Sequence, residues 1–164
     1  MIRPFQTTHP VPSQGYVVYS TKEKLKPEHA GKPGLEIRDL RRAGVDVTDT
    51  VEVPLVAFTG DTTADWIARG KSGEDPVAAD ALRAKLLICE CTFVDDAVDP
   101  EGAREYGHTH VDEIAAEAAF FENEAVLLIH FSARYKAKDI EEQLAARLPP
   151  KLLERVTPLL VGYG

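Results

Sequence analysis

The sequence predicts an α/β fold, in which short buried strands alternate with helices. Three apolar runs, at residues 54–60, 86–89 and 125–129, have the length expected of buried strands. Segments with apolar residues at helical spacing lie between and after these runs. This alternation is typical of a layered α/β domain.

Length and composition indicate one globular domain. The chain has 164 residues, of which 44% are hydrophobic and 28% charged, so it is long enough to bury a real core. It contains neither a run of 18 apolar residues nor a basic-then-apolar amino terminus, which argues against a membrane span and a secretory signal. We therefore expect a cytoplasmic protein. Cys89 and Cys91 alternate along an apolar run, which favours two packed thiols over a disulfide or a metal site.

The charge is unevenly distributed. The formal net charge of −8 argues against a protein that coats nucleic acid generally. Between Lys22 and Gly44, however, there are seven Lys/Arg residues and four acidic ones, which gives this segment a charge of +3. Such a basic segment suits either a phosphate-backbone contact or an ordinary solvated surface, and charge alone does not distinguish them.

In the first half of the chain, a Pro/Gly turn leads into a strand at residues 16–19. The stretch before this turn is short, and we expect further structure to precede Met1. Residues 25–34 form a basic loop, residues 35–43 a helix that stops at Gly44, and residues 54–60 the first buried strand.

In the second half, polar residues 70–80 and acidic residues 95–106 are expected to be irregular. Strands are predicted at 86–89, 125–129 and 156–161, a helix from 111 to about 121, and a helix carrying Ile140, Leu144 and Leu148. Pro149 and Pro150 break this last helix.

The segment Phe58-Thr59-Gly60-Asp61-Thr62-Thr63 delivers a carboxylate to the end of a buried strand. Such a carboxylate can bridge two cations or orient a water molecule. Alternatively, Asp61 forms an Asx turn and caps a helix at residues 62–68.

Other groups able to bind metal or move a proton occupy comparable positions. Glu90 and His130 follow the next two strands, and His9 and His108 lie at turns. Since ligands gather at the carboxyl edge of α/β sheets, we expect these five side chains to converge. Histidines with a carboxylate are the ligands that zinc prefers.

Five blocks of the sequence, in the same order, resemble the family of tRNase Z (ribonuclease Z), the metallo-β-lactamase-fold endonucleases that mature tRNA 3′ ends. The similarity is greatest to the short type of plants and some bacteria. The blocks are residues 9–20 (HPVPSQGYVVYS), 58–63 (FTGDTT), 90–93 (ECTF), 106–110 (YGHTH) and 128–135 (LIHFSARY).

The resemblance implies roles for individual residues. His9, Asp61 and His130 would bind Zn²⁺, with Asp61 as the bridge between two ions. Glu90 and His108 would be catalytic, the imidazole assisting proton transfer to the leaving 3′ oxygen. A carboxylate that holds an imidazole raises its pKa and fixes its tautomer, which suits this role.

The chain departs from the family pattern at two of these blocks. Cys89 stands where the family has the first His of His-Glu-Ala-Thr, and Thr109 and His110 replace Ser-Thr. Both departures leave Glu90 and His108 in place. We expect His110 to lie at the surface or behind the residues that form the site.

The family inserts its tRNA-gripping arm between the His9 and Asp61 blocks, where this chain has a short basic insert at residues 21–50. The resemblance favours a contact with the tRNA backbone there, through Lys22, Lys24, Lys26, Lys32 and Arg38.

The family's His-x-His-x-Asp-His motif, which supplies most zinc ligands, is absent from the sequence. The resemblance implies an αββα sandwich, of which residues 1–164 form a single domain corresponding mainly to the second, carboxyl-terminal half. A half sandwich exposes a sheet face, which predicts a homodimer or a complementary amino-terminal half as partner.

The expected function is hydrolysis of a phosphodiester in precursor tRNA by a metal-activated water, with two zinc ions in the complete site. Two alternatives stay open. The first is a non-catalytic half-domain or partner subunit, and the second a metallo-β-lactamase-fold hydrolase of another substrate.

Overall fold

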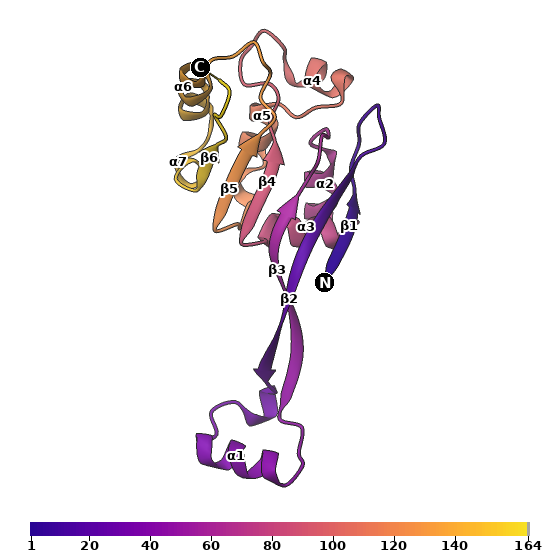
Figure 1. Cartoon of the computed structure of the whole chain (residues 1–164), viewed down its shortest axis with the longest axis vertical. Coiled ribbons are helices and arrows are strands. Elements are labelled where there is room, and N and C mark those ends of the chain that lie inside the picture. The colour runs from indigo at the N-terminus through magenta and orange to yellow at the C-terminus, as the bar shows by residue number, and fades with distance from the viewer. Residues whose placement is uncertain (164) are drawn as a thin grey trace. The chain divides into compact units, whose positions relative to one another are not determined.

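The computed structural model describes residues 1–163 and contains one six-stranded sheet (Figure 1). Its strand order follows the sequence, β1-β2-β3-β4-β5-β6. The strands are β1 (Ile2–Gln6), β2 (Gln14–Leu25), β3 (Thr48–Phe58), β4 (Leu86–Glu90), β5 (Ala125–Ile129) and β6 (Val156–Pro158). The predicted α/β class is therefore confirmed.

Seven α-helices and two short 3-10 helices connect the strands in the described part of the chain. No helix among residues 1–163 combines the length and apolarity needed to cross a membrane. The helices are α1 (Gly34–Arg42), α2 (Asp65–Ser72), α3 (Pro76–Arg83), α4 (Pro100–Tyr106), α5 (Val111–Ala116), α6 (Ala137–Arg147) and α7 (Pro150–Leu153), with η1 (Pro27–His29) and η2 (Ala118–Phe120).

The direction of the strands determines where functional groups can meet. β1 and β2 pair antiparallel, whereas β3 to β6 pair in parallel. The connections after β3, β4 and β5 therefore all leave from the same edge of the sheet. This is the edge at which an α/β sheet collects ligands.

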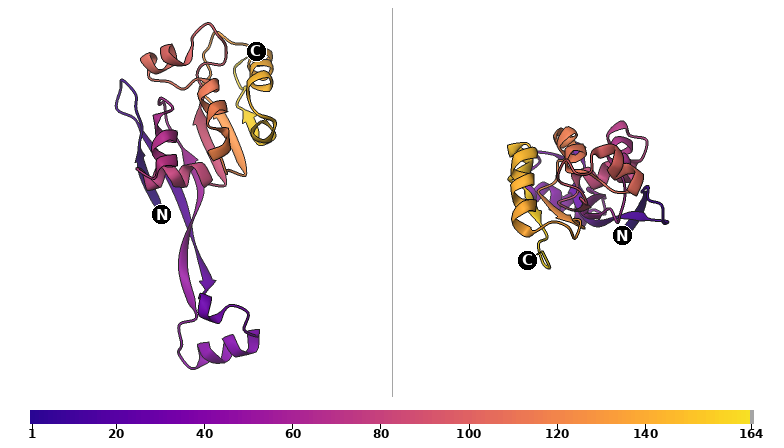
Figure 2. Two further views of the ribbon diagram at one scale, coloured as in Figure 1. Left: turned by 180° about the vertical axis from the view of Figure 1, so that it is seen from behind. Right: turned by 90° about the horizontal axis from the view of Figure 1, so that it is seen from above.

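Helices α2, α3 and α5 cover one face of the sheet, as Figure 2 shows from behind. The side chains on this face are fully buried and include Ala57, Leu87, Cys89, Val126 and Leu128. They alternate with outward-facing residues at the two-residue period of a strand, so the core lies between the sheet and these helices.

The opposite face of the sheet is apolar and open to solvent in the described chain. Phe58 is 41% exposed and Tyr16 43%, and the neighbouring Val56, Ile88 and Leu127 are only half-buried. The structure thus has one helix layer and one sheet layer, which is half of the predicted αββα sandwich.

Residues Tyr19–Val53 form a separate compact unit that contains α1 and the distal ends of β2 and β3. Its buried side chains are Tyr19, His29 and Val47. The Lys26 amide donates to the Val47 carbonyl at 2.9 Å. Helix α1 has no buried residue. The predicted helix at 35–43 is confirmed by α1, and the predicted basic insert at 21–50 lies within this unit.

Two segments expected to be irregular contain helices instead. In both, an Asp precedes a Pro: Asp75 caps α3 through the amides of Val77 and Ala78, and Asp99 caps α4 through that of Gly102. An Asp at the N-cap followed by Pro at the first helical position is a strong helix start. Their polar composition outweighed this signal in the sequence analysis, and both predictions of irregular structure are wrong.

Several predicted boundaries also shift. The helix expected at 62–68 begins at Asp65 with Ala64 as its N-cap, so Asp61 does not cap it. The helix expected at 111–121 ends at Ala116 and continues as η2. Four strands differ in length from their predicted ranges: β2 and β3 are longer, β4 is longer by one residue, and β6 is shorter.

Candidate active site

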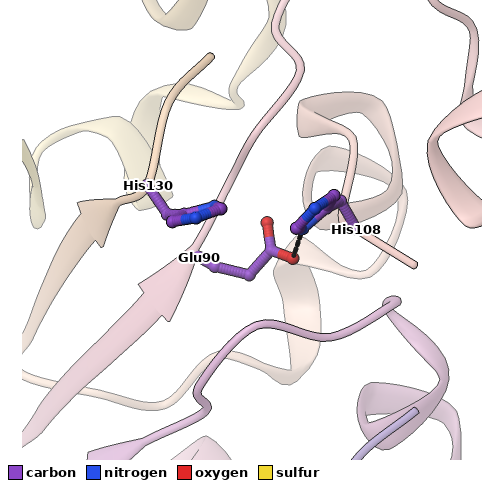
Figure 3. Close-up of side chains that lie close together, drawn as sticks. All are labelled: Glu90, His108 and His130. Carbon is purple, nitrogen blue, oxygen red and sulfur yellow. Dashed lines mark hydrogen bonds and ion pairs between the residues drawn. The ribbon is translucent and has the colours of Figure 1, made fainter. Parts of the chain in front are cut away.

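The five predicted site residues come from five different segments of the chain. Asp61 follows β3, Glu90 ends β4 and His130 follows β5, while His9 lies between β1 and β2 and His108 between α4 and α5. Figure 3 shows the Glu90 carboxylate between the imidazoles of His108 and His130.

Short distances join these residues into one cluster. The Nδ1 atom of His108 lies 3.0 Å from Oε1 of Glu90. The ring centroid of His108 is 5.2 Å from that of His9 and 5.1 Å from that of His130. Nε2 of His130 lies 3.5 Å from Oδ2 of Asp61. The five side chains predicted to converge therefore do so.

Glu90 is fully buried, and its carboxylate is saturated with hydrogen bonds. Besides His108, Oε1 accepts from the amides of Thr62 at 3.0 Å and Thr109 at 3.2 Å. Oε2 accepts from the amide and the hydroxyl of Thr92, at 3.0 and 2.9 Å. A carboxylate has about four acceptor positions, so these five donors leave none for a metal or substrate. The geometry makes Glu90 an orienting group.

His108 is held by Glu90 in a defined orientation. Its hydrogen bond to Glu90 raises the pKa of the imidazole above the ordinary 6.5, against the opposing effect of burial, and the charges of Glu90 and Asp61 add to the increase. Because Nδ1 faces Glu90, the proton there is shared with the carboxylate and Nε2 is the nitrogen left for exchange with a reacting group. The side chain is 17% exposed, which gives that nitrogen access.

The raised pKa of His108 can be tested on the metal-free protein. We expect the His108 imidazole to titrate above 6.5 in an NMR titration of its ring protons. A pKa raised by folding stabilises the native state fully below the unfolded value, and this contribution is lost as the pH rises through the folded value. The unfolding free energy of wild type relative to His108→Asn should therefore fall between about pH 6.5 and the folded pKa. Titration of His108 at or below 6.5 would contradict the assigned Glu90 contact.

Thr92 determines which nitrogen of His130 is available. The Thr92 hydroxyl donates its single proton to Glu90, so toward His130, 3.0 Å away at Nδ1, it acts as the acceptor. Nδ1 then carries the proton, and the Nε2 lone pair points to the Asp61 side of the cluster. His130 itself has a positive φ of 63°, which is uncommon for a residue other than glycine and is typical of functional sites.

His9 is positioned by its own turn. Its Nδ1 atom lies 3.1 Å from both the amide and the carbonyl of Val11. This leaves Nε2 for another partner. His9 and Asp61 together line a cavity of about 420 Å³ with residues Val11, Pro12 and Ser13.

The donor set at this edge fits a divalent cation. Ligand atoms of Glu90, His108 and His130 lie within 4.8 Å of one another, but the carboxylate of Glu90 is already saturated. The donors that remain are imidazole nitrogens of His9 and His130 and the carboxylate of Asp61. Imidazole with carboxylate is the set that zinc and similar ions bind. Asp61 and His130 are thus the close pair that could hold a metal, whereas the ligand atoms of His9 do not lie within 4.8 Å of both.

Three threonines around Glu90 went unnoticed in the sequence analysis. Thr62, Thr92 and Thr109 supply four of its five hydrogen bonds, and the Thr109 hydroxyl also donates to the Thr62 carbonyl at 2.8 Å. The available signal was their position, because each lies within two residues of a predicted site residue.

His110 is not a surface residue, and that part of the prediction is wrong. Its side chain is only 1% exposed. Nδ1 accepts from the Asp112 amide at 3.1 Å and caps α5, while Nε2 lies 3.0 Å from the Asp95 carbonyl. His110 therefore fastens the loop that carries His108 and Thr109.

Cys89 and Cys91 are free thiols and fully buried, as the alternating pattern predicted. Burial raises the pKa of both thiols, which keeps them protonated and unreactive. They pack in the core and take no part in the site.

The residues predicted to contact tRNA lie in the unit Tyr19–Val53. Three of them are in surface ion pairs: Lys26 with Asp46 at 3.4 Å, Lys32 with Glu36 at 2.9 Å and Arg38 with Asp39 at 3.6 Å. Lys22 and Lys24 are exposed on β2. Lys26 and Lys32 are half-buried, and surface ion pairs of this kind contribute little individually.

At one edge of the α/β sheet, the structure thus places the Glu90–His108 pair beside the His130–Asp61 pair. No family model matches the chain. Curated relatives do: it is 52% identical over 162 residues to tRNase Z TRZ1 of Arabidopsis thaliana, covering 99% of this chain and 55% of the relative. It is also 43% identical over 163 residues to the chloroplastic tRNase Z TRZ2 of the same plant, covering 99% and 44%.

A solved structure of human tRNase Z, short form, aligns with a TM-score of 0.49 and 19% identity, covering 97% of this chain and 40% of that one. The sequence relatives confirm the predicted resemblance, since each of these two plant tRNase Z proteins aligns with 99% of this chain. It spans about half the length of the curated relatives it matches.

Proposed function

We propose that this chain carries half of the active site of a zinc-dependent tRNA 3′-processing endoribonuclease. The observation that supports this most strongly is the pair formed by Glu90 and His108, next to the Asp61–His130 pair. A proton-transfer group and a metal-ligand group side by side suit phosphodiester hydrolysis. The names of the homologues indicate tRNA as the substrate.

In this proposal, His108 delivers a proton from Nε2 to the departing 3′ oxygen. Its raised pKa favours the protonated imidazole that this role requires, because Glu90 stabilises the charged form. Asp61, His130 and His9 would hold the metal, which supplies Lewis-acid stabilisation and an activated water when bound. The threonines around Glu90 fix the position of the proton donor His108 relative to the proposed ligand His130, since Thr92 contacts both Glu90 and His130.

The ligand set and the sheet face both require a partner. Three ligands, one of them a bridge, do not complete a two-zinc site, and the sequence has no His-x-His-x-Asp-His motif. The open sheet face with Phe58, Tyr16 and Val56 is apolar and needs cover. We propose that one complementary amino-terminal half both covers this face and supplies the missing ligands. A homodimer would cover the face but add no such motif.

The basic segment between Lys22 and Gly44 is proposed to bind the tRNA backbone through Lys22, Lys24, Lys26, Lys32 and Arg38. Support comes from the segment's net charge of +3 on an otherwise acidic chain. Phosphate contacts of this kind weaken steeply with salt, because binding releases condensed counterions.

A reconstitution tests the catalytic proposal. The chain is mixed with the separately produced amino-terminal half of a tRNase Z homologue, and zinc content and precursor-tRNA cleavage are measured on the same sample. We expect His108→Ala to slow cleavage by about 10²- to 10⁴-fold with zinc content unchanged, since general acid catalysis contributes that much. Asp61→Ala should lower both.

Glu122→Ala is the matched control, because it removes an exposed carboxylate that precedes β5, at the end of the strand opposite to His130, and should change neither quantity. Loss of zinc in His108→Ala would make His108 a ligand and overturn its assignment. Absence of cleavage in a reconstituted sample that contains zinc would overturn the proposed function.

A further inference from the structure

A second cavity opens beside His108, outside the group of proposed metal ligands. It has a volume of about 330 Å³ and is lined by Thr92, Phe93, Val98, Tyr106, His108 and Arg134. The proposed chemistry uses only His108 and Thr92 of these residues. The remaining lining is aromatic and apolar apart from one guanidinium.

Two aromatic rings form the main surface of this cavity. Phe93 is 8% exposed, and its ring centroid lies 5.9 Å from that of Tyr106 and 6.3 Å from that of His108. Tyr106, the last residue of α4, is 62% exposed. A large ring held against the His108 loop, with most of its surface in water, is available for a flat ligand.

Arg134 presents its guanidinium as a plane against the same aromatic cluster. The guanidinium carbon lies 5.3 Å from the ring centroid of Phe93 and 4.7 Å from that of Tyr135. Asp95 accepts from Arg134 at 2.8 Å and from the Tyr135 hydroxyl at 2.8 Å. These contacts fix the side chain and offset its charge, so it offers a stacking plane more than a free cation.

This combination favours a nucleobase over a phosphate. A phosphate site needs uncompensated cations or several amide donors, whereas here the single cation is paired with Asp95. Aromatic rings and an Arg plane are the surfaces on which proteins stack unpaired bases. The cavity also adjoins His108, so a base bound there would belong to a nucleotide next to the reacting phosphate.

We propose that this cavity, with Tyr106 as its principal stacking surface, is the subsite for the unpaired base of the nucleotide that adjoins the scissile phosphate. The proposal rests on the proposed function, which supplies a single-stranded RNA end as substrate. It adds a specificity-determining residue, Tyr106, that has no role in metal binding or proton transfer.

Binding of a short RNA with one fluorescent base, 2-aminopurine, tests the subsite on the chain alone, without metal and without cleavage. Stacking quenches the fluorescence, and we expect Tyr106→Ala to weaken binding about tenfold or more, since one stacked base contributes about 1–3 kcal/mol. Tyr106→Phe should retain the wild-type affinity, because the ring and not the hydroxyl carries the contact.

Phe120→Ala is the matched control. Phe120 is 43% exposed, lies on η2 and does not line the cavity, so its removal should leave binding unchanged. Equal affinities of wild type and Tyr106→Ala would overturn the subsite. So would equal binding of an otherwise identical RNA that lacks the base, because the ligand would then be the phosphate.

The two proposals fail differently. Base binding that depends on Tyr106, together with no cleavage by the zinc-loaded reconstituted sample, would overturn the catalytic function and leave the subsite standing. If His108→Ala slowed cleavage while Tyr106→Ala left the KM for the RNA unchanged, the subsite would be overturned and the catalytic function would stand.

Discussion

Glu90→Gln is expected to destabilise the chain by roughly 2–6 kcal/mol. The amide group of glutamine brings two donor hydrogens into a place where all five neighbours are donors or share a proton with the carboxylate. At least two buried donors then lose their acceptor, and each such loss costs about 1–3 kcal/mol. Urea unfolding of wild type and variant at neutral pH measures the difference.

The same substitution should release His108 and lower its pKa, since the hydrogen bond to Glu90 is the largest cause of the increase. Glu124→Gln is the matched control: Glu124 is exposed and pairs only with Lys85, at 3.0 Å. Its effect should stay within about 0.5 kcal/mol, as is usual for surface positions. If Glu90→Gln also lowered the unfolding free energy by no more than Glu124→Gln does, the hydrogen bonds around Glu90 would not stabilise the fold.

Gly107→Ala should have the second large effect. Gly107 ends α4 with φ +86°, and a Cβ there would lie 2.1 Å from Cδ of Pro10 and 3.0 Å from Cδ2 of His9. The left-handed conformation costs about 1–2 kcal/mol for alanine, and overpacking against a proline ring adds about 1–3 kcal/mol. Because the contact pushes on the His9 turn, we also expect weaker metal binding, measured by zinc titration of the chain.

Gly73→Ala separates these two costs. Gly73 also ends a helix, α2, with φ +77°, but no atom lies within 4 Å of the position a Cβ would take. We expect it to lose only the left-handed cost, about 1–2 kcal/mol, and to bind zinc as wild type does. Equal losses for the two alanine variants would mean that the close approach of Gly107 to Pro10 does not constrain the site.

The strands that carry the site were readable in the sequence because their residues need little tertiary information. The runs ending at Glu90 and Ile129 are apolar and short, and they form β4 and β5 within one residue of the predicted bounds. Helix α3 was missed because the polar stretch 70–75 runs directly into it, and α4 because its own residues are mostly polar. Their start is set by the local pairs Asp75–Pro76 and Asp99–Pro100, a signal that composition hides.

The groups that reach the edge of the sheet could be predicted from the sequence. Asp61, Glu90 and His130 follow parallel strands, and strand direction alone brings them to one side. The sequence also led to the hypothesis of a metal-dependent hydrolase, because His9, His108 and His130 lie in blocks that resemble the tRNase Z family.

The role of each residue within this cluster could be assigned only from its tertiary contacts. Glu90 could have been a metal ligand on spacing alone. It is an orienting group because Thr62, Thr92 and Thr109, from three separate loops, occupy its acceptor positions. His110 likewise is a buried helix cap because Asp95, fifteen residues earlier, folds over it. Hydrogen-bond saturation depends on contacts between distant segments, and a linear sequence does not contain those distances.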